Sequence, residues 1–367
     1  MSSEFGNKIK LSIFGESHGE AIGCVIDSIP AGVKLDMEKI YFDMARRAPG
    51  KDKTATPRLE KDIPHILSGV LNGVTTGAPL AMIIENTNTK SGDYSNLLSV
   101  PRPSHSDYPA YVKYHGNNDI RGGGHFSGRL TAPLVFAGAI AKQILAQKGI
   151  TVGAHILSIN GVLDDSFDKA NVSEKELLAV SSKAFCVIND EIEDKMRASV
   201  EKARLDGDSV GGVIECAVVG VPVGIGANIF STVEGHISSA LFGVPAVKGV
   251  EFGAGFDFAK MTGYEANDTY SISNGNVKID KNNNGGVLGG MTTGAPIIVR
   301  AVVKPTPSIS KAQKSVNLQK MTEEELVIHG RTLALFPGQY PLLKAQLLSL
   351  FLTLWHNIEK RKYKWIY

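Results

Sequence analysis

The order of apolar and polar positions along the chain predicts both helices and strands. Residues 129–148 (RLTAPLVFAGAIAKQILAQK) are apolar on nearly every face, which predicts a deeply buried helix that ends before Gly149. A second helix is predicted to start at Asp36 and to stop before Pro49, and a highly charged helix over 190–205 is predicted to lie on the surface. Val- and Ile-rich runs bounded by Gly or Pro predict strands at 22–26, 81–85, 212–219 and 297–303.

These elements do not alternate regularly as helix and strand, which argues against a doubly wound sheet and favours the α+β class. Glycine is abundant, at 39 residues, and clusters without a fixed period, so no solenoid or propeller repeat is expected. No Pro- or Ser-rich linker divides the chain, and we do not cut its main part into smaller domains.

Composition narrows the class of protein. Of 367 residues, 43% are hydrophobic and 21% charged, which is ordinary for a soluble protein with a sizeable core. The net charge of +2 gives no bulk attraction for nucleic acid or membranes, and the longest apolar runs are too short to span a bilayer. Three Cys residues, none in a CxxC pair, argue against disulfides and against a metal site. With no apolar signal segment at the N-terminus, we expect a cytoplasmic protein.

Polar residues set among Gly or Pro are the candidates for chemistry. They form four motifs and a basic group: FGESHG (14–19), RPSHSD (102–107), RGGGHFSGR (121–129), KPTPS (304–308) and the side chains of Arg46, Arg47, Lys51 and Lys53. A Gly-rich turn that opens a helix presents N–H groups and a positive dipole end, which suits an anion.

Each motif also has a purely structural interpretation. A lone His in a turn is more often structural, and Arg46 and Arg47 favour the C-terminal dipole of their own helix. The glycine run alone is a loop, and KPTPS alone is a strand end stopped by prolines. Taken together, two imidazoles, several guanidiniums and a Gly-rich turn indicate a site where a small polyanion undergoes proton transfer.

The motifs FGESHG, ARRAPGKDKTATPR, RPSHSDY, RGGGHFSGR, VKGVEFGAGF, NNNGGVLGG and KPTPSI, in this order, resemble chorismate synthase. The resemblance runs from near the N-terminus to about Arg331 and implies one large β–α–β sandwich domain over 1–331. It also implies a homotetramer that removes phosphate from 5-enolpyruvylshikimate 3-phosphate by an anti 1,4-elimination, giving chorismate. The family requires reduced FMN, although the reaction is redox-neutral overall.

The resemblance assigns roles residue by residue. Arg47, Arg102 and Arg129 are implied to bind the substrate, with Arg46 and Lys53 as further substrate- or NADP-binding positions. His18 is implied to be the general acid for the leaving phosphate, and His105 to protonate the reduced flavin or hold its anion. Ser17 and Ser127 match hydroxyls beside the flavin. Other positions matching FMN contacts are His125, Phe126, Ala246, Gly289, Lys304, Pro305, Thr306, Pro307, Ser308 and Arg331.

Two positions depart from the family pattern within the matched region. Lys53 stands where many members have Arg, which keeps the charge but loses the fork of donors. His125-Phe126 replaces an Arg-Ser pair found in other members.

The larger departure is the tail, residues 332–367. After Gly-Arg the family continues His-Asp-Pro-Cys, and its Asp assists removal of the substrate proton; this chain continues Thr332-Leu333-Ala334. Codons for Asp-Pro-Cys-Ile, read one base later, encode Thr-Leu-Ala. Residues 338–344 can likewise be written with codons that, read in the neighbouring frame, give Arg-Ala-Val-Pro-Val-Val-Glu, which resembles the family's sequence. We therefore hypothesise a frame-shifted tail, with a genuinely divergent terminus as the alternative.

Three functions remain open at this point. The first is a flavin-dependent lyase, whose flavin is reduced by NADPH or by a separate reductase. The second is an impaired relative that still binds FMN or substrate but lacks the acid of the tail. The third, an anion-binding or oligomer-scaffold protein, accounts for the arginines but not for two His motifs.

Overall fold

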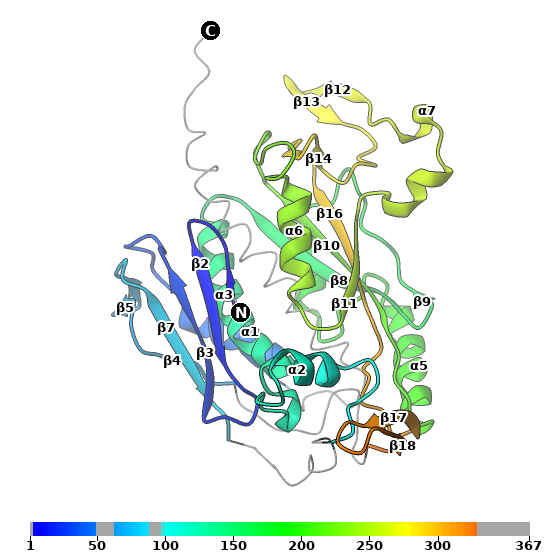
Figure 1. Cartoon of the computed structure of the whole chain (residues 1–367). Coiled ribbons are helices and arrows are strands. Elements are labelled where there is room, and N and C mark those ends of the chain that lie inside the picture. The colour runs from blue at the N-terminus through cyan, green and yellow to red at the C-terminus, as the bar shows by residue number, and fades with distance from the viewer. Residues whose placement is uncertain (1–2, 49–61, 88–96, 98, 329–367) are drawn as a thin grey trace.

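The computed structural model describes residues 3–48, 62–87, 97 and 99–328, which form two antiparallel sheets with helices between and around them (Figure 1). The first sheet contains the predicted strands at 22–26 and 81–85 and is antiparallel throughout. Its strands, in spatial order, are β1 (Glu4–Phe5), β2 (Lys10–Gly15), β3 (Ala21–Asp27), β7 (Leu80–Glu85) and β4 (His65–Ile66).

The second sheet contains the other two predicted strands. The central strand β10 (Gly212–Val219) pairs along its length with β16 (Ile297–Val303) on one side and with β8 (Thr151–Ile159) on the other. These strands are Val- and Ile-rich and mostly buried, as expected where helices cover a sheet. The spatial order is completed by β11 (Val247–Phe252) beside β16 and β9 (Val162–Leu163) beside β8.

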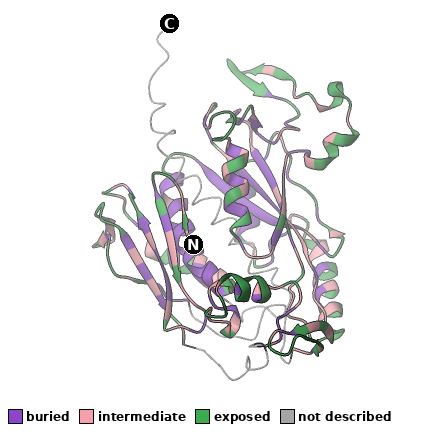
Figure 2. Cartoon of the chain, viewed as in Figure 1, coloured by how far each residue is buried: buried purple, intermediate pink, exposed green. Residues whose placement is uncertain are grey.

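The helix α3 (Thr131–Ala146) lies between the two sheets, where it contacts β2, β3 and β7 on one side and β8 on the other. Thirteen of its 16 residues are buried, which confirms the prediction of a helix that is apolar all round. Figure 2 shows buried residues concentrated in this middle layer and on the sheets beside it. The layers sheet, helix and sheet confirm the predicted α+β sandwich.

The helical stretch 121–146 is also apolar and long enough to be a candidate membrane span, although 83% of its 18-residue apolar segment is buried in the protein. The glycines at its start interrupt the helix, because Gly122, Gly123 and Gly124 have φ values of 59°, 89° and 53°. The α-helix itself is therefore 16 residues, or about 24 Å, which is shorter than a bilayer core. We conclude that α3 is the core helix of the sandwich.

The remaining helices cover the outer edges of this core. The predicted helix from Asp36 is α1 (Met37–Arg47), which packs on α3, with Asp36 accepting a hydrogen bond from the Lys39 N–H. The predicted charged helix begins as the short 3-10 helix η4 (Asp190–Ile192) and continues as α5 (Glu193–Leu205). The others are α2 (Asp107–Lys113), α4 (Glu174–Ser182), α6 (Val233–Phe242) and α7 (Gly263–Ala266), with the 3-10 helices η2 (Arg121–Phe126), η3 (Gly128–Leu130) and η5 (Gly255–Lys260).

Four small hairpins project from the sandwich. The hairpin closest to the second sheet, β14–β15, has its turn at Gly289 and leads into β16. The strands of the four are β5 (Val70–Leu71) with β6 (Val74–Thr75), β12 (Tyr270–Ser273) with β13 (Asn276–Ile279), β14 (Val287–Leu288) with β15 (Met291–Thr292), and β17 (Gln313–Asn317) with β18 (Thr322–Leu326).

A charged cluster lies inside the second sheet, at the register where His155 of β8 faces Glu215 of β10. The imidazole of His155 is fully buried, with Nδ1 3.1 Å from Asp164 Oδ2 and Nε2 3.0 Å from Glu215 Oε2. Burial alone would lower the pKa of His155, but the two carboxylates outweigh it and raise that pKa. Both nitrogens donate, so the cluster holds an imidazolium, and the Phe167 ring packs edge-on at 4.6 Å.

Candidate active site

The turn between β2 and β3 buries two polar side chains, with Ser17 0% and His18 8% exposed. The Ser17 hydroxyl has one hydrogen, and it donates to the Arg121 carbonyl at 3.0 Å. The Ser17 oxygen therefore accepts from Nδ1 of His18, also at 3.0 Å. This chain of hydrogen bonds fixes the imidazole and leaves Nε2 as the nitrogen that can exchange a proton.

The glycine turn of η2 lies against two histidines. A Cβ on Gly122 would lie 2.3 Å from Cε1 of His18, and a Cβ on Gly123 would lie 3.4 Å from Cε1 of His105. Both glycines have positive φ, at 59° and 89°, which L side chains adopt only with strain. The imidazoles of two motifs that are distant in sequence thus pack against Gly122 and Gly123. A side chain at either position would be strained, so the turn needs glycine.

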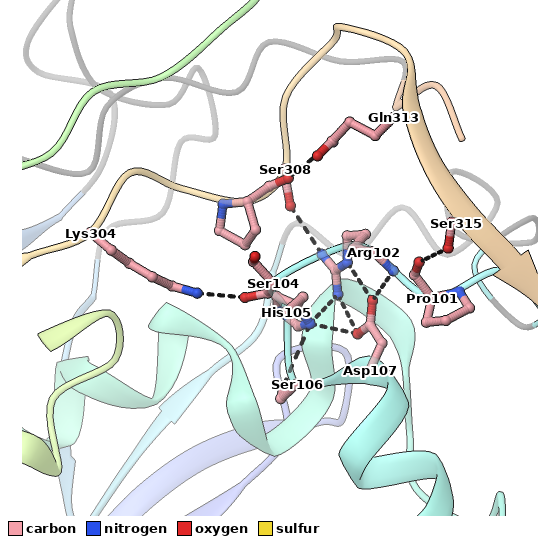
Figure 3. Close-up of polar contacts among 11 residues, drawn as sticks. Pro101, Arg102, Ser104, His105, Ser106, Asp107, Lys304, Ser308, Gln313 and Ser315 are labelled. Carbon is pink, nitrogen blue, oxygen red and sulfur yellow. Dashed lines mark hydrogen bonds and ion pairs between the residues drawn. The ribbon is translucent and has the colours of Figure 1, made fainter. Parts of the chain in front are cut away.

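The motif RPSHSD forms a compact charged cluster at the start of α2 (Figure 3). Arg102 donates two hydrogen bonds to the Asp107 carboxylate, from Nε at 2.7 Å and from Nη2 at 2.8 Å. Nδ1 of His105 lies 2.6 Å from Asp107 Oδ1 and 3.1 Å from Arg102 Nη2. Since a guanidinium only donates and a carboxylate only accepts, Nδ1 carries the proton and donates to Asp107.

The ionisation state of Asp107 determines the charge of this cluster. Burial would raise the pKa of its carboxyl, but hydrogen bonds and charge from Arg102 and His105 outweigh burial and hold that pKa far below its ordinary value. Asp107 is therefore ionised throughout the neutral range. It orients the His105 ring so that Nε2, the other nitrogen, lies on the side of the glycine turn.

The segment after β16 closes on this cluster, as Figure 3 shows. Arg102 Nη1 donates to the Ser308 hydroxyl at 3.3 Å, and Lys304 Nζ donates to the carbonyl of Ser104. The Lys304 N–H donates to the carbonyl of Ala246 at 2.9 Å. The structure therefore gathers four residues that the sequence predicted to contact cofactor or substrate, and it places an ammonium, a guanidinium and a hydroxyl together.

A second cationic cluster lies beside Gly128, which follows the glycine turn in the chain. Asp62, whose side chain is 0% exposed, accepts from Arg47 Nη1 at 2.5 Å and from Arg129 Nη1. Arg129 Nε also donates to the amide oxygen of Asn86 at 3.0 Å. Within the described residues, both guanidiniums pair with the Asp62 carboxylate, and guanidiniums are the side chains best suited to hold an anionic ligand. Of the predicted substrate arginines, Arg47 and Arg129 thus lie together.

Arg46 and His125 are held by protein groups instead. Arg46 Nη1 donates to the carbonyl of Ser181, and Nη2 donates to that of Lys183 at 3.2 Å, so Arg46 binds the C-terminal end of α4. His125 Nδ1 donates to the Gly15 carbonyl at 2.8 Å, and its Nε2 accepts from Ser3 Oγ at 2.8 Å. These contacts show which protein groups hold the two side chains, while the binding roles that the resemblance implies for them stay predictions.

The remaining predicted positions fall around the two clusters, with one exception. Gly289 lies in the hairpin before β16, whereas Lys304 follows the opposite end of that strand (Figure 1). Phe126 is 37% exposed, and Ser127 caps η3 by accepting from the Arg129 N–H. Between Lys304 and Ser308, the carbonyl of Thr306 accepts from Ser209 and that of Pro307 accepts from Gln313, while Pro305 packs near Gly211. Lys53, Arg331 and the tail from 332 lie outside the described residues.

Three residues of the site had been assigned no role. Asp107 stands inside a quoted motif, two residues after its His, and a His–x–Asp spacing was a usable signal. Asn86 directly follows a buried strand, a position where polar residues often serve a site. Asp62 follows a basic, Pro-containing stretch. Its role could not be predicted from the sequence, because the two arginines that it binds are 15 and 67 residues away.

Comparisons with known proteins were made on the whole chain. A family model described as chorismate synthase matches residues 9–348. The chain is 47% identical over 326 residues to chorismate synthase of Thermococcus kodakarensis, covering 89% of both chains. It is 44% identical to that of Korarchaeum cryptofilum, covering 89% of this chain and 90% of the relative. A crystal structure of chorismate synthase matches with a TM-score of 0.72 and 26% identity, covering 95% of this chain and 93% of that one.

Proposed function

The chain belongs to the chorismate synthase family, and we propose that the two charged clusters around the glycine turn are its working active site. The family's reaction removes phosphate from 5-enolpyruvylshikimate 3-phosphate by anti 1,4-elimination and gives chorismate, the last step of the shikimate pathway. Identity above 40% over nine-tenths of the chain favours this enzyme over an impaired relative.

The substrate is a polyanion with a phosphate and two carboxylates, and the arginines supply its binding. Arg47 and Arg129 both pair with the carboxylate of Asp62, which places two guanidiniums together at a largely buried position. Guanidiniums hold phosphate and carboxylate by pairs of parallel hydrogen bonds, so they also fix the orientation of the substrate. Their charge stabilises the negative charge that grows as phosphate departs.

In our proposal His18 donates a proton to the leaving phosphate. The carbon–oxygen bond breaks, the phosphate oxygen keeps the electron pair, and Nε2 of the His18 imidazolium provides the proton. Nδ1 stays bonded to Ser17 throughout, so the ring does not rotate during the transfer. The observation that carries this assignment is the packing of His18 and His105 against successive glycines of one turn.

The donor set beside His105 fits reduced FMN. Lys304, Arg102 and the Ser308 hydroxyl offer cationic and neutral donors to a phosphate or an anionic ring, and Gly123 offers a surface without a side chain. Held there by these residues, reduced FMN would provide the electron-rich ring that the family's elimination requires. His105 holds or moves a proton at Nε2, while Asp107 holds Nδ1.

Further parts of the proposal concern the assembly and the tail. We propose a cytoplasmic homotetramer whose flavin is reduced by NADPH or by a separate reductase. The tail from Thr332 replaces the family's His-Asp-Pro-Cys. Sequencing the gene across the Arg331 codon tests the frame-shift hypothesis, and an intact frame with no nearby insertion or deletion contradicts it.

Purified protein, assayed without oxygen in the presence of chemically reduced FMN and substrate, tests the proposed reaction through chorismate absorbance. We expect turnover. Flavin quenching with substrate but no turnover identifies an impaired relative, and binding of neither ligand identifies a plain anion-binding protein. His18→Ala should lower turnover about 100- to 10,000-fold, the usual contribution of a positioned acid. A near-normal rate removes the acid role of His18.

A further inference from the structure

Asn86 connects the turn that carries His18 with the guanidinium of Arg129 through hydrogen bonds. It directly follows β7, and its backbone N–H donates to the Glu20 carbonyl at 3.0 Å, one residue beyond the pair that Ala21 and Glu85 form. Its backbone is therefore fixed by the first sheet. The side chain is directed from this fixed point and is neither fully buried nor exposed.

The amide of Asn86 contacts two different parts of the site. Its Nδ2 donates to the carbonyls of Glu16 and Gly19, both at 2.9 Å, which bracket Ser17 and His18. Its Oδ1 accepts from Arg129 Nε at 3.0 Å. The opposite orientation of the amide would set donor against donor and carbonyl against carbonyl, so these contacts admit one arrangement.

The turn does not depend on Asn86 alone to form. The Gly19 N–H donates to the Glu16 carbonyl at 3.1 Å, and the Ser17 hydroxyl donates to the Arg121 carbonyl. Loss of the amide should leave the turn closed but less firmly oriented. Because proton transfer needs the imidazole within hydrogen-bond reach of the leaving group, a small change in orientation affects turnover more than folding.

We propose that Asn86 is a positioning residue that holds the His18 turn and the Arg129 guanidinium at one fixed spacing. This inference rests on the proposed function, in which Arg129 binds the substrate and His18 protonates the leaving phosphate. The two ends of the amide have separable effects: its nitrogen acts on turnover through His18, and its oxygen acts on substrate binding through Arg129.

Two substitutions separate these ends. Asn86→Asp keeps an oxygen for Arg129 but loses both donors to the turn, so kcat should fall about 10- to 100-fold, from two lost hydrogen bonds. Its carboxylate also offsets part of the Arg129 charge that binds the anionic substrate, so KM and the substrate dissociation constant should rise further than in Asn86→Ala. Asn86→Ala loses both ends, so the same fall in kcat should come with a dissociation constant raised about 5- to 30-fold.

Asn117→Asp is the matched control. Asn117 is exposed, and its Nδ2 also donates to two turn carbonyls, those of Tyr114 and His115, at 3.1 and 3.2 Å. This variant should keep the wild-type kcat and dissociation constant. All rates are compared per folded molecule, with the folded fraction taken from thermal melting.

The proposal is overturned if both Asn86 variants retain wild-type constants, or if Asn86→Asp binds the substrate no more weakly than Asn86→Ala. An equal loss in Asn117→Asp also overturns it, because any turn amide would then matter alike. Substrate dissociation is measured without turnover. If wild-type protein makes no chorismate, the proposed function fails, while the contrast between the Ala and Asp variants in binding still decides the role of Asn86.

Discussion

Two histidine–carboxylate clusters in this molecule use the same chemistry in opposite surroundings. His105 donates to Asp107 at the start of α2, where its side chain is 17% exposed and a glycine turn covers it. His155 lies between Asp164 and Glu215 inside the second sheet, with no exposure, and the Phe167 ring covers it. A contact between an imidazole and a carboxylate is therefore not enough to identify a candidate active site.

The difference lies in what each cluster leaves available. Both nitrogens of His155 are used by carboxylates, so this ring can neither accept nor give a proton without breaking a buried ion pair. His105 uses Nδ1 for Asp107 and directs Nε2 toward a turn that lacks side chains. We conclude that His155 belongs to the folded core, and we propose that His105 serves the reaction.

The largest effect should come from His105→Ala. Removing a positioned proton carrier should lower kcat about 100- to 10,000-fold, with little change in melting temperature because the ring is partly exposed. Steady-state rates in the anaerobic assay measure it. The exposed His115→Ala serves as the control and should keep wild-type turnover. A melting temperature that falls together with kcat would erase the contrast with His155.

His155→Gln should lower the free energy of unfolding by about 3–5 kcal/mol at pH 6, because two buried carboxylates then lose the imidazolium between them and only the Arg300 guanidinium, 3.7 Å from Glu215, remains. Urea unfolding measures this quantity. His65→Gln, at an exposed position of β4, should change it by less than about 0.5 kcal/mol. Equal effects of the two variants would mean that the buried cluster contributes no special stability.

Asp107→Asn should lower kcat about 10- to 150-fold, the equivalent of one charge-assisted hydrogen bond of about 1.5–3 kcal/mol. The amide no longer pairs with Arg102 or fixes the proton on Nδ1 of His105. Asp257→Asn, which breaks an exposed pair with Lys260, is the control and should leave kcat unchanged. Wild-type turnover in Asp107→Asn would mean that His105 needs no carboxylate.

The smallest effect concerns pH. The pKa of His155 is raised in the folded protein, so its contribution to stability is complete below the ordinary value of about 6.5 and is lost as pH rises through the folded value. Wild type and His155→Gln should therefore converge in unfolding free energy on the alkaline side, by about 1.4 kcal/mol for each unit of the pKa shift. A difference that stays constant from pH 6 to 9 contradicts an imidazolium in the cluster.

The sequence predicted the fold where patterns are local. The apolar helix α3, the capped helix α1 and the four strands β3, β7, β10 and β16 were all expected, because each has a continuous apolar pattern between Gly or Pro residues. The strand β8 is equally buried but was missed, since His155 and Gly153 interrupt its apolar run and its partners are distant in sequence.

The site was predicted in part. Motif context identified His18, His105 and Lys304, which lie at turns and strand ends, and the structure brings each into one of the clusters around the glycine turn. It named Arg47 as a substrate arginine and Arg46 as a further binding position, and in the structure the two bind different protein groups because adjacent helical positions face about 100° apart. Asp62 was beyond reach, since its role depends on two arginines that only tertiary structure brings together.

Turnover per folded molecule, measured for His105→Ala and His155→Gln in one anaerobic assay, tests the central claim most directly. The account predicts that His155→Gln, although much less stable, retains nearly the wild-type rate once corrected for its folded fraction. It predicts that His105→Ala, although fully folded, loses at least about 100-fold. A His105→Ala variant as fast as wild type, or a folded His155→Gln variant as slow as His105→Ala, would contradict it.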